Sequence, residues 1–351
     1  MSAADSNLGR KAIKARRARH WLLLAGLLAT VAIPFLLGGR GTLAAALNIG
    51  PSGYAALLGL VLASWMARAL KLHLLLHRLK APATLTRSFG ISVASDLAFT
   101  ATPAGLGGYV ATIYYLRRAG ASAAGATTIM AIDQGTDLVF FALSVPLVTL
   151  ALSDSDAPRA MTVTALGALA VASAFVATLW LARRKILSLL LAPKPILARW
   201  PLAARAQQAL RTFLAGSRTY FSLIVAAGSS LFLKVLGLTA MQWLTRYAVL
   251  WLTLLLLHHP VSFALTFLLQ VVVLHAALWT GVPAGGGGAE LGLTAMLAHW
   301  IAPSDMATAL VIWRAATLYV LLLAGSVAML ILARVTPRMS AVPPSEPPVP
   351  E

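Results

Sequence analysis

Two matching stretches decide the fold: Thr102-Pro103-Ala104-Gly105-Leu106-Gly107-Gly108 and, about 180 positions later, Val282-Pro283-Ala284-Gly285-Gly286-Gly287-Gly288. Five positions agree, pairing Pro103 with Pro283, Ala104 with Ala284, Gly105 with Gly285, Gly107 with Gly287 and Gly108 with Gly288. In membrane proteins, Gly/Pro interruptions at corresponding positions of two halves mark broken helices whose freed backbone groups line a cavity. The duplication therefore predicts a transport-like site.

Glycine runs also occur in continuous helices, where they allow close packing in lipid. A continuous helix would not place proline beside several glycines, however, because proline costs roughly 3 kcal/mol and each glycine about 1 kcal/mol in a helix interior. We therefore expect helix breaks near Pro103 and Pro283. The half-helices that follow would direct backbone N–H groups and the positive end of the dipole toward an anion, such as a phosphate group.

The composition is that of a membrane protein. Hydrophobic residues make up 59% of the chain and charged residues 11%, against roughly 25% charged in a soluble domain. The absence of cysteine excludes disulfides, thiolate catalysis and cysteine metal sites. The net charge of +18 does not indicate a nucleic-acid partner, because the basic residues flank apolar segments and no aromatic-interleaved basic domain accompanies them.

A spanning helix needs about 20 mostly apolar residues. The candidate spans are 21–39, 52–76, 123–152, 160–182, 219–257 and 305–333. Two further apolar stretches, 88–116 and 261–300, carry the Pro/Gly motifs. We therefore expect an all-α polytopic membrane protein with about six spanning helices and two re-entrant helical hairpins.

Lys and Arg collect in cytoplasmic loops. The basic segments here are 10–19, 68–87, 117–118, 183–218 and 334–338. Both termini and these segments are therefore predicted to be cytoplasmic, with the loop 153–159 outside. The stretch 88–116 then enters and leaves on one side, and 261–300 enters from the other, which gives an inverted repeat. If 219–257 is instead two helices with Arg246 in a loop, the repeat is parallel.

The expected domain plan has a single transmembrane domain. Its parts are a basic N-terminal segment 1–20, a transmembrane domain 21–335 with repeat 1 at about 52–152 and repeat 2 at about 219–333, and a tail 336–351. The tail is rich in proline and is predicted to be disordered. Segment 183–218 alternates basic and apolar residues, which is typical of an amphipathic helix on anionic headgroups; a solvated linker is the alternative.

Several ionisable residues fall within or beside the apolar segments: Asp96, Asp133, Asp137, Lys234, Arg246, His275, Glu290 and Arg314. A charge at the centre of a membrane helix costs about 2.5–3.5 kcal/mol on insertion scales unless it is paired or hydrated. Asp133 and Asp137 share a helix face. If Arg314 lies near Asp133, Asp137 or Glu290, the arginine and that carboxylate neutralise each other. The alternative is that such pairs clamp helices together without touching a substrate.

Enzymatic alternatives have little support. His73 and His77 share a helix face, but Leu74 stands where a metalloprotease carries its general base. The serines lack a G-x-S-x-G elbow. We expect no enzyme activity, no metal and no cofactor. The predicted substrate-binding residues are Arg314, Glu290, Asp133, Asp137, Pro103, Pro283, Gly105, Gly107, Gly108, Gly285, Gly287 and Gly288.

Four elements carry a family resemblance: P-x-G-x-G-G at 103–108, D-Q-x-x-D at 133–137, G-G-G-G-A-E at 285–290, and Arg314. Together they resemble the flippase-like transmembrane region of the lysylphosphatidylglycerol synthase, or multiple peptide resistance factor, family over roughly 20–335. The resemblance implies a bacterial inner-membrane protein that translocates lipids with modified or polyisoprenoid headgroups.

The sequence departs from the family pattern in its first half. Tyr109 and Val110 stand where an acidic residue usually follows the glycines, and Gln134 stands in place of an arginine. The site therefore rests more on Glu290 and Arg314. The soluble synthase domain would not fit in the residues after 338, so lipid synthesis is not expected.

Two functions follow from these patterns. The first is a flippase or transporter for an anionic or polyisoprenoid-type lipid, driven by a gradient or a partner because the sequence has no nucleotide-binding P-loop. The second is a non-transporting membrane subunit that holds a lipid-modifying or envelope-biosynthesis enzyme in place. Charged residues facing a hydrated groove favour the first function, and charges all paired in a dry core favour the second.

Overall fold

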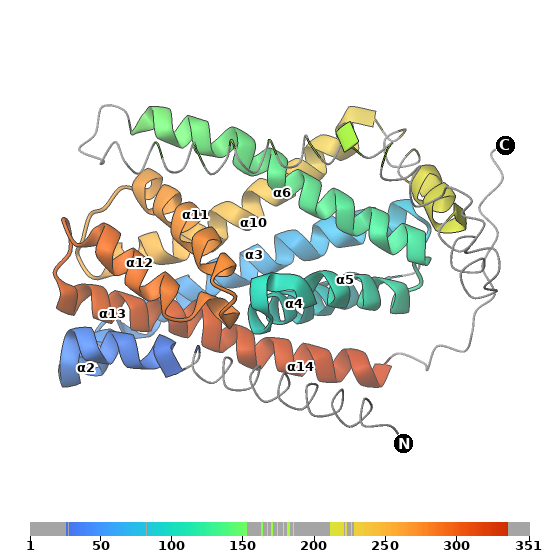
Figure 1. The fold of residues 1–351 in the computed structure, drawn as a ribbon. Helices are drawn as coiled ribbons and strands as arrows, with labels where there is room; N and C mark the ends of the chain where they lie inside the picture. The colour runs from blue at the N-terminus through green and yellow to red at the C-terminus, as the bar shows by residue number, and fades with distance from the viewer. Residues whose placement is uncertain are drawn as a thin grey trace, which may run out of the picture. The chain divides into compact units, whose positions relative to one another are not determined.

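The computed structural model describes residues 28–81, 83–152, 211–220 and 228–335, together with the single positions Gly26, Val163, Gly167, Ala170, Ala174, Thr178, Leu181, Ala182, Lys185, Ser222 and Ala226. All regular elements of this part of the chain are helices (Figure 1), which confirms the all-α class. The predicted segments 1–20, 153–159 and 336–351 lie outside the described residues, as do most of 160–182 and 183–218.

The helices follow the same order in the two halves. An apolar helix Leu28–Gly38, η1 (Gly39–Gly41) and α2 (Thr42–Leu47) come first. The first half then contains α3 (Gly50–Arg78), α4 (Leu85–Ala101), η2 (Pro103–Gly105), α5 (Leu106–Arg118) and α6 (Ala123–Ala151). The second contains α10 (Gly228–Leu256), α11 (Phe263–Trp279), η3 (Pro283–Gly285), α12 (Gly288–Leu297), α13 (Pro303–Arg314), η4 (Ala315–Tyr319) and α14 (Val320–Val335). The helices α3 and α10 both have 29 residues, and α4 and α11 both have 17.

The described helices include three that are long and apolar enough to cross a membrane: Gly50–Arg78, Ala123–Ala151 and Pro303–Arg334. They correspond to the predicted spans 52–76, 123–152 and 305–333. The third contains a five-residue π-helix, η4, between α13 and α14. The total of six spans and the orientation of the repeat stay predictions.

Strained backbone also recurs at matching places. Four non-glycine residues of the described chain have positive φ: Lys80 (54°), Ala104 (51°), His258 (63°) and Ala284 (60°). Lys80 and His258 follow the ends of α3 and α10, while Ala104 and Ala284 lie in the two Pro/Gly motifs. Because positive φ is uncommon for residues with a Cβ, its recurrence at corresponding positions shows that the two halves share their local backbone.

The helix breaks predicted near Pro103 and Pro283 are confirmed. Proline pushes the preceding residue out of the helical region, and both Thr102 (φ −121°, ψ 146°) and Val282 (φ −81°, ψ 127°) are extended. Each proline then begins a 3₁₀ turn in which the alanine is left-handed. The breaks η2 and η3 contact each other.

Residues 219–257 do not form two helices separated at Arg246. The helix α10 runs unbroken from Gly228 to Leu256 with Arg246 inside it, and a separate helical stretch covers 211–220. The alternative of a loop at Arg246 is therefore wrong. Arg68 and Lys71, which the basic pattern assigned to a cytoplasmic flank, are instead buried within α3.

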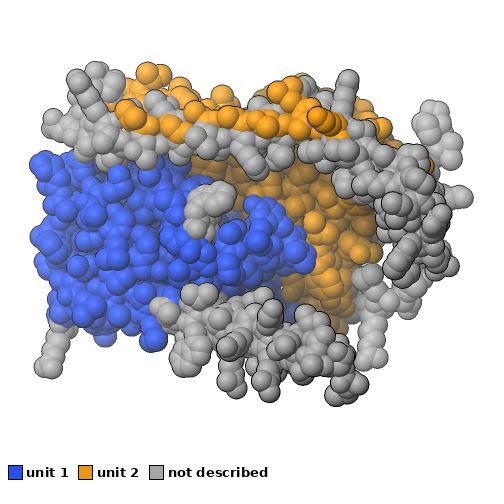
Figure 2. Space-filling view, viewed as in Figure 1, with its two compact units in different colours: residues 1–64, 93–111, 244–329 blue, residues 65–92, 112–243, 330–351 orange. Residues whose placement is uncertain are grey.

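The chain divides into two compact units (Figure 2). Unit 1 comprises 1–64, 93–111 and 244–329, and unit 2 comprises 65–92, 112–243 and 330–351. Within unit 1, α12 packs between α11 and α13, and α2 packs on α13; Phe267 and Tyr247 are fully buried in this core. Within unit 2, the core includes Leu72 and Ile129. Unit 1 therefore contains both helix breaks.

We expect Gly285→Ala to destabilise the protein and Gly237→Ala not to. Gly285 has φ +61°, and an added Cβ would lie 2.9 Å from the Cβ of Ala277; alanine at such a position costs more than about 1 kcal/mol. Gly237 lies inside α10, and its added Cβ would meet no atom within 4 Å, so alanine should stabilise the helix by about 0.5–1 kcal/mol. Melting temperatures in detergent, followed by tryptophan fluorescence, measure both effects. Equal melting temperatures for the two variants would contradict the strained break.

Candidate functional site

At the first break, an uncharged side chain accepts the hydrogen bond of a freed backbone N–H group. Thr102 Oγ1 donates to the Ala98 carbonyl at 2.8 Å and accepts from the Gly107 N–H at 2.8 Å. An added Cβ on Gly105 would lie 3.2 Å from the Phe99 ring, and one on Gly107 or Gly108 would overlap the side chain of Thr102 or Phe99. The three predicted glycines of the first motif therefore allow close packing, and Thr102 already accepts the hydrogen bond of one freed N–H group.

At the second break, a carboxylate accepts the hydrogen bond of a freed backbone N–H group. Glu290 is the third residue of α12, and its Oε2 accepts a 2.8 Å hydrogen bond from the Gly287 N–H. This is the carboxylate half of a capping box. Gly287 itself has φ +82°. Its added Cβ would lie 3.4 Å from the Ala29 Cβ in the N-terminal helix. The carboxylate thus fixes the start of α12.

Arg314 joins the same break to α13. Its Nε donates to Glu290 Oε1 at 2.6 Å, and its Nη1 makes a long 3.5 Å contact with the Ala284 carbonyl. The guanidinium lies 4.5 Å from the centroid of the Trp313 ring. The side chain of Arg314 is 6% exposed and that of Glu290 is fully buried. Of the three pairings that the sequence leaves open for Arg314, the one with Glu290 is formed, and it ties α13 to the helix break.

The third nitrogen of this guanidinium, Nη2, differs from Nε and Nη1. Among the described residues, the buried Nη2 of Arg314 has no hydrogen-bond partner. An unsatisfied buried donor costs about 1–3 kcal/mol, and more when the group is charged. The π-helix η4 begins directly after Arg314, and single π turns are frequent at functional sites. The spare donor therefore makes Arg314 the strongest candidate for contact with an anion.

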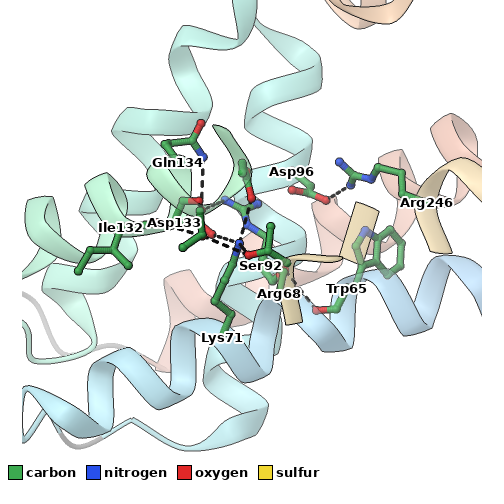
Figure 3. Close-up of polar contacts among 12 residues, drawn as sticks. Trp65, Arg68, Lys71, Ser92, Asp96, Ile132, Asp133, Gln134 and Arg246 are labelled. Carbon is green, nitrogen blue, oxygen red and sulfur yellow. Dashed lines mark hydrogen bonds and ion pairs between the residues drawn. The ribbon is translucent and has the colours of Figure 1, made fainter. Parts of the chain in front are cut away.

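Unit 1 holds a second ion pair. Arg246 of α10 pairs through Nη2 with Asp96 Oδ2 of α4 (Figure 3). The Asp96 side chain is 6% exposed, whereas that of Arg246 is 30% exposed. Both residues were candidates from the sequence. The pair links the half-helix before the first break to the long helix of the second half.

Unit 2 contains a cluster of four charges. Lys71 Nζ lies 2.6 Å from Asp133 Oδ1 and 3.1 Å from Asp137 Oδ1. Arg68 Nη2 donates to Asp133 Oδ2 at 3.2 Å. Lys71 also donates to Thr239 Oγ1 of α10 at 3.1 Å. Figure 3 shows Arg68 and Lys71 of α3 directed toward Asp133 of α6. We call these four charged residues the α3–α6 cluster.

The cluster is electrically balanced and buried. Arg68, Lys71 and Asp133 are 4% exposed or less, and Asp137 is 14% exposed. Gln134, which replaces the family arginine, lies beside it with Nε2 3.5 Å from Asp133 Oδ2. The sequence leaves Asp133, Asp137 and Glu290 open as the acid that Arg314 neutralises. The structure pairs Arg314 with Glu290, and it supplies Asp133 and Asp137 with cations from α3.

Sequence reasoning missed Arg68, Lys71 and Thr239. The basic segment 68–87 predicts a cytoplasmic flank, although α3 continues about two turns beyond Lys71. A usable signal was present, because Trp65-x-x-Arg68 recurs as Trp243-x-x-Arg246 at a shift of 178 positions. That recurrence aligns Arg68 with Arg246, which the sequence already marks as an ionisable residue within an apolar segment.

Other candidates have local roles. Lys234 is exposed on α10. The Nδ1 of His275 lies 2.7 Å from the Val271 carbonyl of its own helix, in keeping with a satisfied bundle histidine.

Comparison with protein families decides the assignment. The family model described as "Lysylphosphatidylglycerol synthase TM region" matches residues 22–325. The chain belongs to this family. Both helix breaks, the Arg314–Glu290 pair and the α3–α6 cluster lie in the matched region. A search of curated proteins gives no match. Family membership and the apolar helices identify an integral membrane protein.

We expect Asp133→Asn to destabilise the protein strongly. The variant leaves Arg68 and Lys71 buried with only Asp137, and breaking a buried ion pair costs about 3–5 kcal/mol. Asp305→Asn is the matched control, because Asp305 is 51% exposed and pairs with His259 Nε2 at 3.2 Å; an exposed pair is worth about 1 kcal/mol or less.

Unfolding of the purified variants in mixed micelles measures the difference. The double variant Arg68→Gln/Asp133→Asn restores charge balance and should recover part of the loss. Equal losses of unfolding free energy in Asp133→Asn and Asp305→Asn would show that the ion pairs of the α3–α6 cluster stabilise the protein no more than an exposed pair does.

Proposed function

We propose that this protein moves an anionic lipid between membrane leaflets and binds the headgroup phosphate at Arg314, beside the second helix break. The observation that carries the proposal is the buried Nη2 of Arg314, which has no hydrogen-bond partner among the described residues. A phosphate oxygen would supply the missing acceptor, and guanidinium–phosphate hydrogen bonds are strong and directional.

The surroundings of Arg314 suit an anion that enters and leaves. Glu290 holds Nε, so the guanidinium is oriented before a lipid arrives. The α12 N-terminus adds a positive dipole end at the same break. Because the carboxylate balances the resting charge, the site stays neutral when empty and gains the phosphate charge only on binding. Such a site would bind the phosphate less tightly than an arginine without a carboxylate partner would.

The repeated architecture supports transport. The two halves share element order, helix lengths and left-handed residues at the breaks. With α10 unbroken, the basic segments favour opposite orientations for the halves and cytoplasmic termini, and the breaks become the tips of re-entrant hairpins. Inverted repeats allow a midplane site to open alternately to either side. Together with the family, this favours a transporter in a bacterial inner membrane.

A non-transporting subunit is the second candidate, and a specific observation favours it. The described carboxylates Asp96, Asp133, Asp137 and Glu290 all pair with arginine or lysine from another helix. Fully paired charges are what a helix clamp requires. In that case the protein would position a lipid-modifying enzyme, and the spare donor of Arg314 would contribute nothing.

We expect Arg314→Gln to reduce translocation of a fluorescent phosphatidylglycerol analogue in reconstituted vesicles by at least about tenfold. The variant loses a charged hydrogen bond to phosphate worth about 1.5–3 kcal/mol, and 1.4 kcal/mol corresponds to about tenfold. Lys234→Gln, which removes one exposed cation from α10, should keep the wild-type rate.

Size-exclusion profiles show whether Arg314→Gln still folds. If the variant aggregates, and the double variant Glu290→Gln/Arg314→Gln regains both monodispersity and wild-type translocation, the pair is a clamp and the phosphate role is wrong.

A further inference from the structure

The ammonium group of Lys71 occupies an oxygen-lined cation position in unit 2. A lysine ammonium carries three N–H donors. Lys71 Nζ donates to Asp137 Oδ1 and to Thr239 Oγ1, both at 3.1 Å, and it lies 2.6 Å from Asp133 Oδ1 in an ion pair. These oxygens would suit a small hydrated or partly hydrated cation, but a tethered cation already lies among them. The α3–α6 cluster is therefore not suited to binding a sodium ion.

The two carboxylates of the cluster are held unequally. Asp133 is fully buried and contacts two cations, Arg68 and Lys71. Asp137 forms an ion pair with one cation, Lys71, and its side chain is 14% exposed. Protonation of Asp133 would leave two buried cations facing one carboxylate. Protonation of Asp137 would leave Asp133 between its two cations, so Asp137 is the carboxylate that can take up a proton with the smaller electrostatic penalty.

Four described side chains act on the Asp137 carboxylate. Lys71 and Arg68 face it from α3, Asp133 faces it from one turn earlier on α6, and Trp243 faces it from α10. Thr239 of α10 reaches it indirectly by accepting from Lys71. With both carboxylates ionised the charges of the α3–α6 cluster sum to zero, and protonation of Asp137 leaves the cluster with a net charge of +1.

A purely structural clamp would not need this arrangement. The Arg68–Asp133 pair alone would hold α3 to α6, yet a second carboxylate shares the Lys71 ammonium. A hydroxyl chain continues from Lys71 through Thr239 to Thr136, with 3.1 Å for each contact. When Asp137 is neutral, its ion pair with Lys71 becomes an ordinary hydrogen bond. The electrostatic attraction between Lys71 of α3 and helix α6 is then weaker. Ionisable residues inside membranes commonly serve as such proton sites.

We propose that Asp137 is a proton-binding site, and that its protonation couples a proton gradient to lipid movement. The coupling rests on the proposed transport function, whereas the proton site does not. In the step, a hydronium ion transfers one proton to the Asp137 carboxylate, which gives a carboxylic acid and water; release is the reverse. Lys71 acts as the positioning residue, because its interaction with Asp137 is an ion pair when Asp137 is ionised and a weaker hydrogen bond when Asp137 is protonated.

Two measurements on the full-length protein in liposomes test the proposal. Infrared difference spectra between acidic and neutral pH should show a carboxylic-acid C=O band that is lost in Asp137→Asn. Asp96→Asn is the matched control, because Asp96 is also a buried carboxylate in an ion pair, and this variant should keep the band. If Asp137→Asn fails to fold, the charge-balanced double variant Lys71→Gln/Asp137→Asn replaces it and should also lack the band.

The second measurement compares translocation of a fluorescent phosphatidylglycerol analogue with and without an imposed pH gradient. The wild type should be faster with the gradient, and the two rates should be equal in Asp137→Asn. Persistence of the band in Asp137→Asn overturns the proton site. A wild type that translocates lipid equally fast in both conditions, or only under a sodium gradient, overturns the coupling. A band that disappears as expected in a protein that moves no lipid supports the proton site and counts against the transport function alone.

Discussion

The cost of an unpaired charge away from water is the constraint on which the described structure depends. Asp96, Asp133, Asp137 and Glu290 are each joined to an arginine or lysine from another helix. Every such pair fixes which helix faces can meet, because slipping a helix by one residue would strand both charges. Apolar packing alone would not specify that register, since lipid tails compete with the apolar side chains. The ion pairs therefore select one arrangement among many of similar hydrophobic burial.

The helix breaks were predictable because their cause is local. Proline excludes the helical region for the residue before it, and glycine tolerates positive φ, so the motifs at 102–108 and 282–288 specify a break without tertiary information. The pairing of Arg68 and Lys71 with Asp133 was not predictable in this way. Sequence alone shows a basic residue near the end of an apolar run, and only the packing of α3 against α6 distinguishes a buried cation from a cytoplasmic one.

The two breaks share a backbone but differ in chemistry. At the first, the Thr102 hydroxyl accepts the Gly107 N–H, and at the second the Glu290 carboxylate accepts the Gly287 N–H. A carboxylate needs a cation when buried, and Arg314 supplies it. The corresponding position of the first half holds Gln134, which is neutral, like Thr102. The substitution at 134 is thus consistent with the absence of a buried acid at the first break.

The kind of cation at each position follows from the number and geometry of its partners. Lys71 meets three oxygens from two helices, which matches the three rotatable donors of an ammonium; a planar guanidinium could not point at all three. Arg314 instead donates through Nε to Glu290, while its Nη2 has no hydrogen-bond partner in the described part of the chain. An ammonium in that place would have to release the carboxylate to contact a second anion. The arginine can serve a structural partner and a ligand together, so the clamp and the binding role assigned to Arg314 do not exclude each other.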